Sequence, residues 1–329
     1  MKRGGKNSGA LTRARTISVR VPASSANLGS GFDCFGVALG LYLNVRARAV
    51  AEQIEPCRAK YSGEGADSLP KTADNLIYRA AMLVAEREGF RLPPLEIGVT
   101  NQIPLGRGLG SSAAAVVAGV LIGAAFAPHR LPAERVLACA AEIEGHADNV
   151  AAALYGGWVI VVSKALSAGG AQSQNGVVAI RRPWPQRLRA VVVSPEVQTD
   201  THASRKLLSA EVRREDAVFN LQRVALFVAA IDAGRPDLLW EAMRDRLHQP
   251  RRVALVPGLA DALETPRQPG LAGVALSGSG PSVLALATGH ASQIGRKIAA
   301  AFTAHGIRST VRILPAGVSG ARVTGRPAR

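Results

Sequence analysis

The sequence predicts an α+β protein with two domains, and three observations support this prediction. A chain of 329 residues that is 47% hydrophobic and 19% charged has the size and composition of about two globular domains. Strand-like and helical spacings of apolar residues alternate through the first half of the chain. A stretch rich in Gly, Ser and Gln at 167–176 then interrupts the pattern, which begins again after it.

The first half combines strand patterns with helical ones. Apolar and polar residues alternate at 16–21, 41–50 and 95–103, as in half-buried strands. Helical spacing at 75–88 predicts a helix. Two further helices are expected at 111–127 and 132–145, the second ended by Gly145, and a strand at 156–163 completes this half.

The second half repeats the mixture of strands and helices. We expect strands at 188–194 and 309–314, a pair of strands within 273–287, and helices near 215–232, 236–247 and 291–305. We therefore place an N-terminal domain at 16–165 and a C-terminal domain at 177–316. Basic tails remain at 1–15, which we predict to be disordered, and at 317–329.

The composition argues against fibrous, membrane-spanning and disulfide-rich proteins. The most apolar stretch, at 113–127, is shorter than the ~20 residues that a membrane span requires, so it predicts a buried helix. The basic N-terminus leads into a strand pattern and not into an apolar leader, so we expect a cytoplasmic protein. Three cysteines without CxxC spacing indicate neither a disulfide framework nor a thiolate metal site.

A net charge of +16 raises the question of nucleic acid, but the distribution of the charge argues against it. Residues 1–15 carry five Lys or Arg and residues 321–329 carry three, with no acid in either segment. Half of the excess charge therefore lies in the tails. Aromatic residues, which would stack on bases, make up only 4% of the chain. We predict no nucleic-acid partner and no membrane partner.

The stretch PLGRGLGSSAAAVVAGV at 104–120 places three glycines directly before an apolar helix. Gly106, Gly108 and Gly110 can adopt φ > 0 without a Cβ clash, so several backbone N–H groups can face one point. The first turn of the following helix adds further donors, and together they favour an anion such as phosphate. The loop lacks the lysine of a Walker A motif and the second strand of a dinucleotide fingerprint. A glycine-rich turn without a ligand is the alternative.

Four other stretches gather polar or cationic residues, and each has a plain structural alternative. Asn27 and Asp33 lie in a Gly- and Ser-rich segment at 21–39 that also fits a turn. The segment EIEGHADN at 142–149 is unusually polar, although a charged helix end explains part of it and its HxD spacing is weak evidence for zinc. Arg205 in TDTHASRKLL and Arg252 in HQPRR are each typical of surface cations. The Gly-Ser-Gly-Pro turn at 278–281 offers backbone N–H groups or simply closes a hairpin.

In their order and spacing, PASSANLGSGFD, PLGRGLGSSAA, EGHADNVA and LSGSGPSVLAL resemble the GHMP kinase superfamily, and within it most closely the homoserine kinases. The resemblance spans about residues 20 to 315. Its most specific motif, P-x(3)-G-L-G-S-S-A-A, holds nucleotide phosphates without a Walker lysine. SANLGSGFD, GHADN, T-x-x-x-R and HQP-x-R separate the homoserine kinases from relatives that act on mevalonate or galactose. The implied fold is an N-terminal ribosomal-protein-S5-domain-2-like domain and a C-terminal ferredoxin-like domain.

Carried over by motif, the resemblance implies a role for each matching residue. The ATP phosphates would lie against Pro104, Gly106, Arg107, Gly108, Leu109, Gly110, Ser111 and Ser112. The amino-acid substrate would be bound by Asn27, Asp33, His146, Thr201, Arg205 and Arg252; the arginines suit a carboxylate and Asp33 suits an ammonium group. Asn149, Asp148 and Glu142 are the implied catalytic residues, with Ser112 or Ser111, and Glu142, near Mg²⁺. Because the spacing before HADN varies in the superfamily, Glu144 is a rival to Glu142.

The activity that the resemblance implies is transfer of a phosphoryl group from ATP, with Mg²⁺, to the side-chain hydroxyl of L-homoserine, a step of threonine biosynthesis. The role of Asp148 stays open between general base and substrate binding. One alternative is another small-molecule GHMP kinase of the mevalonate type, and a second is a basic nucleic-acid-binding protein that reuses the fold. The expected partner is the small-molecule substrate, and a homodimer is allowed.

Overall fold

The computed structural model describes residues 16–50, 54–163, 176–199 and 201–325, without the side chains at 201 and 202. Its first sheet has seven strands in the order β11-β1-β2-β4-β3, with β5 beside β2 and β6 beside β5. Only β3 and β4 run parallel among these pairs. The strands are β1 (Thr16–Ala26), β2 (Phe35–Ala49), β3 (Cys57–Gly63), β4 (Leu95–Asn101), β5 (Trp158–Ser163), β6 (Val177–Arg182) and β11 (Arg322–Thr324).

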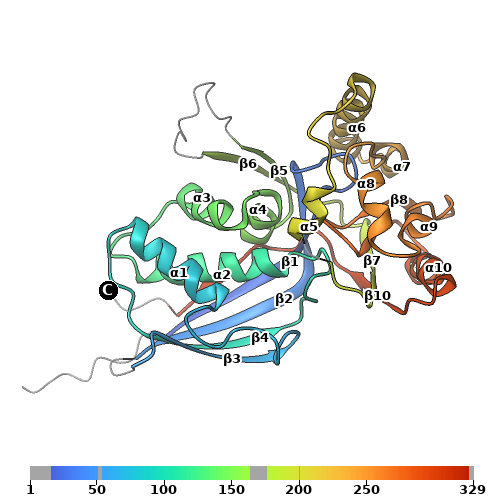
Figure 1. Ribbon diagram of the computed structural model, residues 1–329. Coiled ribbons are helices and arrows are strands. Elements are labelled where there is room, and N and C mark those ends of the chain that lie inside the picture. The colour runs from blue at the N-terminus through green and yellow to red at the C-terminus, as the bar shows by residue number, and fades with distance from the viewer. Residues whose placement is uncertain (1–15, 51–53, 164–175, 200, 326–329) are drawn as a thin grey trace, which may run out of the picture.

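Four helices cover one face of this sheet (Figure 1). They are α1 (Leu76–Arg87), α2 (Ser111–Phe126), α3 (Ala133–Glu144) and α4 (Asp148–Tyr155). The apolar stretch at 113–127 forms the buried helix α2, as predicted, and it packs closely on α1. At Gly119 a Cβ would come within 2.2 Å of the Ile77 carbonyl oxygen, so only glycine allows this approach. No helix in the described ranges is long and apolar enough to cross a membrane.

The second sheet is fully antiparallel in the order β10-β7-β9-β8, which is the strand order of a ferredoxin-like domain. It consists of β7 (Arg189–Pro195), β8 (Leu271–Leu276), β9 (Val283–Ala287) and β10 (Ser309–Leu314), with α9 (Leu259–Leu263) and α10 (Ala291–Ala304) packed on it. Alternate residues of β7 serve two cores: Ala190 and Val192 pack with the first domain, whereas Val191 and Val193 pack under α9 and α10. The two domains therefore share apolar surface.

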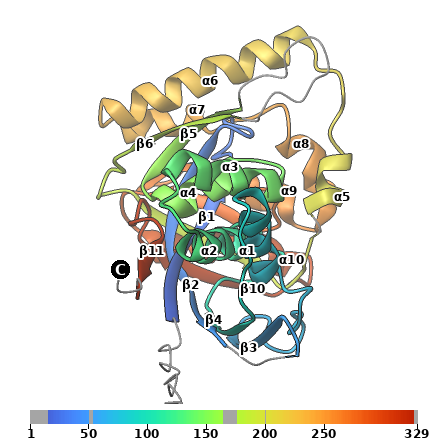
Figure 2. The ribbon, with the colours of Figure 1, turned by 90° about the vertical axis from the view of Figure 1, so that its left-hand side faces the viewer.

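The longest helix, α6 (Arg214–Asp232), lies across the first domain near β5 and β6 (Figure 2). Its Phe227 packs against Phe35 of β2 and Trp158 of β5, with ring centroids 5.0 and 5.6 Å away. After α6 the chain forms four short segments: η1 (Pro236–Leu238), α7 (Leu239–Ala242), α8 (Gln249–Arg252) and η2 (Val253–Leu255). Between α5 (Thr201–Lys206) and α6 the chain returns from the second sheet to this layer.

The α+β class and the two-domain arrangement are as predicted, and the differences are local. The sequence predicted one helix at 236–247, but α7 ends at Ala242. The Asp245 carboxylate accepts from the backbone N–H groups of residues 247–249 and so favours a turn there. The sequence patterns did not predict β3, α4, α5, β6, α8, η2, α9 or β11. Pairing of β6 with β5 and of β11 with β1 assigns both strands to the first sheet, although the sequence placed them in the C-terminal domain and the tail. Residues 1–15, 164–175 and 326–329 lie outside the described part.

Candidate active site

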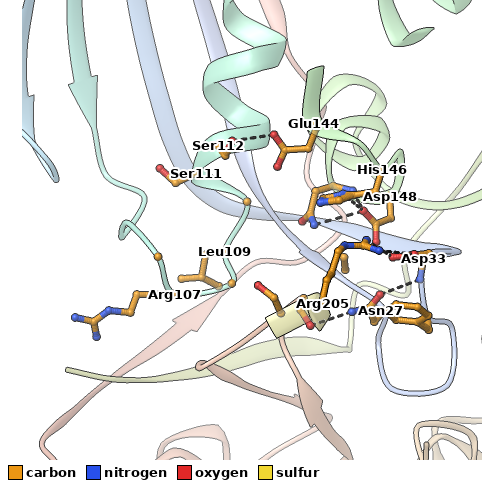
Figure 3. Close-up of a pocket in the computed structure, with 18 of the residues that line it drawn as sticks. Asn27, Asp33, Arg107, Leu109, Ser111, Ser112, Glu144, His146, Asp148 and Arg205 are labelled. Carbon is orange, nitrogen blue, oxygen red and sulfur yellow. Dashed lines mark hydrogen bonds and ion pairs between the residues drawn. The ribbon is translucent and has the colours of Figure 1, made fainter. Parts of the chain in front are cut away.

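A cavity of about 160 Å³ opens where the glycine loop, the β1–β2 loop and the start of α4 meet α5 and α8 (Figure 3). Of the predicted site residues, all but Glu142 and Thr201 line it; the side chain of Thr201 lies outside the described part. The lining residues are Asn27, Asp33, Pro104, Gly106, Arg107, Gly108, Leu109, Gly110, Ser111, Ser112, His146, Asp148, Asn149, Arg205 and Arg252, together with Ala26, Phe32, Glu144, Gly278 and Ser279. Segments far apart in the sequence thus form one site.

The glycine loop reaches α2 with three residues in the left-handed region. Gly106, Gly108 and Gly110 have φ of +62°, +70° and +68°. Gly110 caps α2 and, as a glycine, has no side chain to accept from the first backbone N–H groups of the helix. These donors border the cavity, where they and the positive end of the helix dipole favour an anion.

Backbone contacts on both sides hold the glycine loop in place. The Leu109 carbonyl accepts from the Ser24 N–H at 3.1 Å, and the Gly108 carbonyl accepts from the Ser277 hydroxyl at 2.7 Å. A Cβ at Gly108 would lie 2.1 Å from the Ser277 carbonyl oxygen, so this glycine is needed for packing as well as for its φ. The guanidinium of Arg107 points away from the polar cluster of the cavity and donates to the carbonyl of Pro195.

One carboxylate approaches the start of α2. The Ser112 hydroxyl donates to Oε2 of Glu144 at 2.8 Å, and both residues line the cavity. Glu142, which the sequence favoured, forms an ion pair with Arg87 on the outer surface instead. Positions two apart on a helix point about 200° away from each other, so Glu142 and Glu144 cannot face the same site. The hydroxyl and carboxylate that meet at the start of α2 thus belong to Ser112 and to Glu144, the rival that the motif spacing left open, and the metal role of either glutamate stays a prediction.

The HADN segment forms a chain of hydrogen bonds at the wall of the cavity. Oδ1 of Asp148 accepts from Nδ1 of His146 at 2.9 Å and from the backbone N–H of Asn149 at 2.6 Å. The buried hydroxyl of Ser24 in turn donates to Oδ1 of Asn149 at 2.9 Å. Burial alone would lower the pKa of His146, but the hydrogen bond and charge of Asp148, with the charge of Glu144, outweigh burial and raise it.

At the opposite end of the cavity, Arg205 of α5 and Asp33 of the β1–β2 loop form a two-point ion pair. The Arg205 nitrogens lie 3.0 and 2.7 Å from the two carboxylate oxygens. Asn27 shapes this loop, since its Oδ1 accepts from the Asp33 N–H at 3.0 Å and its Nδ2 donates to the Gly278 carbonyl at 2.9 Å. Both ends of the Asn27 amide therefore bond within the chain.

Arg252 lies beside this ion pair but is buried, with 1% of its surface exposed. Its guanidinium carbon is 5.5 Å from the centroid of the Phe32 ring. Burial, the largest influence, lowers the pKa of Arg252, and the like charge of Arg205 acts in the same direction. Its hydrogen-bond partners in the described structure are neutral: Nη1 lies 3.0 Å from Nδ1 of His248 and 3.4 Å from the Gly278 carbonyl oxygen. A negatively charged ligand would complement this site.

Sequence reasoning missed three contributors to the cavity. Phe32 contacts both arginines through its ring. Ser24 fixes Asn149, and His248 contacts Arg252. The motifs PASSANLGSGFD and HQPRR contain all three residues, but nothing in the motif alone says which side chains meet.

Comparison with known proteins agrees with this geometry. The family models for the GHMP kinase N-terminal domain and the GHMP kinase C-terminal domain match residues 75–157 and 227–304. The homoserine kinase of Solibacter usitatus is 44% identical over 81% of this chain and 83% of its own length. That of Moorella thermoacetica is 40% identical over 90% of this chain and 96% of its own length.

Comparison with solved structures also finds similarity to a homoserine kinase. A crystal structure of homoserine kinase from Cytophaga hutchinsonii superposes with a TM-score of 0.79 at 30% identity, covering 94% of this chain and 98% of that chain. A mevalonate diphosphate decarboxylase from Enterococcus faecalis, at 13% identity and a TM-score of 0.62, shares the fold alone. The chain belongs to the GHMP kinase superfamily and, within it, to the homoserine kinase family.

Proposed function

We propose that the chain transfers the γ-phosphoryl group of ATP to the side-chain hydroxyl of L-homoserine, giving O-phospho-L-homoserine and ADP. One observation carries the proposal: a single cavity joins an anion-binding glycine loop to a set of charges that complements an α-amino acid. Membership of the homoserine kinase family supports the same substrate. The mevalonate-type alternative is not favoured, because the similarity to proteins of mevalonate metabolism is one of fold alone.

The charges at the Asp33 end suit a zwitterion. Arg205 and Arg252 would bind the α-carboxylate, and Asp33 would bind the α-ammonium group. Arg205 and Asp33 satisfy each other without substrate, so a ligand must replace their mutual hydrogen bonds. A hydroxy acid would leave Asp33 without a cation, whereas an amino alcohol would leave Arg205 without an anion. The pair therefore favours substrates that carry both charges.

The glycine loop end suits the nucleotide phosphates. Backbone N–H groups of residues 106–112 would bind the phosphate oxygens, and the loop needs no lysine for this. Ser112 and Glu144 provide the hard oxygen donors that Mg²⁺ prefers, and a site with one carboxylate and phosphate oxygens is typical of this ion. When bound, Mg²⁺ would neutralise charge on the phosphates.

Transfer needs the hydroxyl in line with the γ-phosphorus; a new P–O bond forms as the bond to ADP breaks, and the hydroxyl proton is released. Oδ1 of Asn149 accepts from Ser24, and its Nδ2 lies 3.5 Å from Oδ1 of Asp148, which leaves the second N–H of Nδ2 to orient the substrate oxygen. Asp148 already accepts from His146 and from the Asn149 N–H, which supports a positioning role over that of a general base. Under a positioning role, Asp148→Asn should raise the KM for L-homoserine more than it lowers kcat.

A substrate screen tests the function. ATP consumption with L-homoserine, mevalonate and galactose should be appreciable only with L-homoserine. Two truncated analogues sharpen the result: 4-hydroxybutyrate lacks the ammonium group and 3-aminopropan-1-ol lacks the carboxylate. Both should be far poorer substrates than L-homoserine. Turnover of 4-hydroxybutyrate at the rate of L-homoserine would contradict the zwitterion site, and preference for mevalonate would contradict the function.

A further inference from the structure

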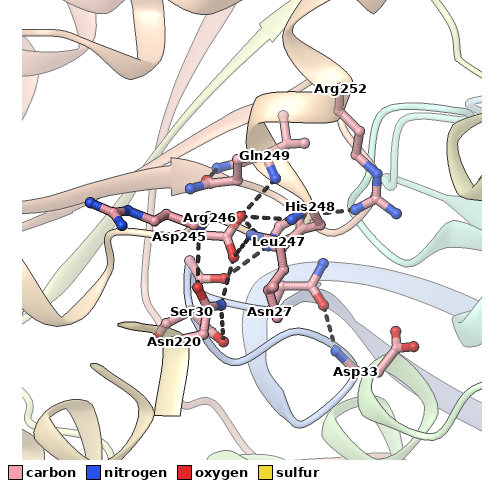
Figure 4. A network of polar contacts seen from close by, with 12 residues as sticks. Asn27, Ser30, Asp33, Asn220, Asp245, Arg246, Leu247, His248, Gln249 and Arg252 are labelled. Carbon is pink, nitrogen blue, oxygen red and sulfur yellow. Dashed lines mark hydrogen bonds and ion pairs between the residues drawn. The ribbon is translucent and has the colours of Figure 1, made fainter. Parts of the chain in front are cut away.

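A buried imidazole lies between the two segments that form the amino-acid end of the cavity (Figure 4). His248 directly precedes α8 and has no exposed surface. Its Nε2 is 2.8 Å from the carbonyl oxygen of Gly29, and its Nδ1 is 3.0 Å from Nη1 of Arg252. The Phe32 ring stacks on it with centroids 5.1 Å apart. The imidazole thus contacts the loop that carries Asp33 and an arginine that lines the cavity.

The hydrogen-bond chemistry determines the state of this imidazole. A guanidinium group can only donate, so Nδ1 of His248 must accept from Arg252. A carbonyl can only accept, so Nε2 must carry the proton that is donated to Gly29. The ring is therefore neutral and protonated on Nε2. Burial, the largest influence, lowers the pKa of His248, and the charge of Arg252 also lowers it. Asp245, the Gly29 carbonyl and Asp33 raise this pKa, but together they do not outweigh burial.

A neutral acceptor has a specific consequence for Arg252. A carboxylate in the place of His248 would orient the guanidinium but would also cancel its charge. The imidazole orients the guanidinium and leaves its charge available for a ligand. Asp33, Asp245 and Asp148 act on the charge of Arg252 through space, but none of them hydrogen-bonds to it in the described structure, and Asp33 is already bonded to Arg205.

The turn that carries His248 is itself held firmly. The fully buried Asp245 carboxylate accepts backbone N–H groups from Leu247, His248 and Gln249 at 3.0, 3.0 and 2.7 Å. It also accepts from Nδ2 of Asn220 at 2.7 Å, which anchors the turn to α6. His248 therefore sits on a rigid support, as a group that positions another side chain requires.

We propose that His248 is a positioning residue whose neutral imidazole holds the Arg252 guanidinium at the carboxylate end of the cavity without cancelling its charge. The same ring ties Arg252 to the Gly29 backbone, so that the loop with Asp33 and the arginine keep a fixed separation. The inference deepens the proposed function and rests on it for the identity of the carboxylate. It assigns a role to the histidine of HQPRR, for which the motif indicated only the arginine.

Steady-state kinetics of three substitutions test the role. His248→Phe keeps a ring but removes both hydrogen bonds, and it should raise the KM for L-homoserine at least tenfold while the KM for ATP stays within twofold. His248→Asn places an amide oxygen near the position of Nδ1 and should recover most of the loss. His248→Gln keeps only a donor near Nε2 and should recover less. His305→Asn is the matched control, since His305 pairs with Asp261 on the surface and should change neither KM.

A double substitution separates positioning from a general structural role. In an Arg252→Ala background, His248→Phe should not raise the KM for L-homoserine further, because no guanidinium is left to position. Additive increases in the double variant, equal increases in both KM values, or an unchanged KM in His248→Phe would each overturn the proposal. If His248→Phe does not fold, His248→Gln, which keeps only the donor, takes its place in the same comparison, and a KM for L-homoserine equal to that of His248→Asn would overturn the proposal.

Nuclear magnetic resonance of ¹⁵N-histidine-labelled protein gives a readout that needs no substrate. The His248 signals should report a neutral ring protonated on Nε2 at pH 7, and Arg252→Ala should shift the Nδ1 resonance. A charged ring or an Nδ1-protonated tautomer would overturn the inference even if the chain phosphorylates L-homoserine. The expected tautomer in a chain that fails to phosphorylate L-homoserine would leave the arrangement intact and refute the proposed function.

Discussion

The two ends of the cavity are lined by different kinds of chemical group. The phosphate end is mostly backbone: glycines with positive φ and the first turn of α2 present N–H groups. The amino-acid end consists of charged and aromatic side chains from the β1–β2 loop, α5 and α8. Backbone donors recognise any phosphate oxygen, whereas fixed side-chain charges recognise one pattern of ligand charge. Under the proposed function, the backbone end would bind the phosphates of any nucleotide, and substrate choice would depend on the other end.

The two ends also differ in how they are assembled from the sequence. The glycine loop is continuous from residue 104 to residue 112, so its geometry is local. The ion pair of Arg205 with Asp33 joins residues 172 positions apart, and it exists only because the second domain packs against the first. Substitutions at the phosphate end should affect ATP use, and substitutions at the amino-acid end should affect L-homoserine binding, with little overlap.

The largest effect is expected for Glu144 and Ser112, whose side chains hydrogen-bond to each other at the glycine-loop end of the cavity. Glu144→Gln removes the carboxylate that faces Ser112, and kcat should fall about 10²–10³-fold because stabilisation of phosphate charge is lost. The Mg²⁺ concentration for half-maximal rate should rise in Glu144→Gln and, more modestly, in Ser112→Ala. Rates over a Mg²⁺ titration check this, and circular dichroism melting should match wild type. A wild-type Mg²⁺ dependence in both variants would exclude this pair as the metal site.

The glycine loop should be the next most sensitive. Gly110→Ala forces an L-residue to φ +68° and brings its Cβ within 2.1 Å of the Ser24 hydroxyl oxygen. The left-handed conformation costs about 1–2 kcal/mol of stability at any such glycine. At Gly110 the Cβ clash also displaces the loop, and such a displacement should lower kcat/KM for ATP at least about tenfold. Gly89→Ala is the matched control, because Gly89 has φ +67° with no atom within 4 Å of the added Cβ.

Gly110→Ala should lose at least as much thermal stability as Gly89→Ala, because only its Cβ meets a neighbour, and only Gly110→Ala should lose ATP use. Isothermal titration with a non-hydrolysable ATP analogue measures the difference. Equal ATP binding by the two variants would mean that the loop is a turn and not a phosphate site.

The sequence was sufficient for the local features of both domains. The apolar run at 113–127 could only be buried, and Gly145 ends α3 in the left-handed conformation as expected. The glycine spacing predicted a loop with positive φ, which the structure shows, and the phosphate role of that loop stays a prediction. By contrast, β11 has three residues and pairs with β1 at the other end of the chain, and β6 pairs with β5 across the Gly-, Ser- and Gln-rich stretch that predicted a domain boundary, so no local pattern revealed either pairing.

Side-chain partners were the least predictable part of the site. The choice between Glu142 and Glu144 depends on where α3 ends and on which face meets α2, and both are tertiary properties. Likewise, HQPRR indicated Arg252 but not that a neutral histidine four residues earlier would contact its guanidinium. Family motifs name residues, and packing decides which of them meet.

At the amino-acid end, the two arginines should differ in effect. Arg252→Ala removes a buried guanidinium that has neutral partners, and it should raise the KM for L-homoserine about 10- to 150-fold, since charged hydrogen bonds contribute about 1.5–3 kcal/mol. Arg205→Ala should raise it less, because the substitution also frees Asp33 for the ammonium group. Initial-rate kinetics should show the KM for ATP nearly unchanged in both variants. Parallel increases in the two KM values would argue against separate ends.

The smallest effect is expected from Glu142→Gln, which is the direct counterpart of Glu144→Gln. Glu142 is 42% exposed and its partner Arg87 is 51% exposed, so the ion pair is worth below about 1 kcal/mol. The carboxylate points away from the cavity, and kcat, both KM values and the Mg²⁺ dependence should match wild type. Raised salt should reduce even the small stability difference, because exposed pairs are screened. Thermal melts at low and high salt, measured beside the Mg²⁺ titration, check both statements. Loss of activity in Glu142→Gln with a wild-type melting curve would return the metal role to Glu142 and would require α3 to rotate relative to α2.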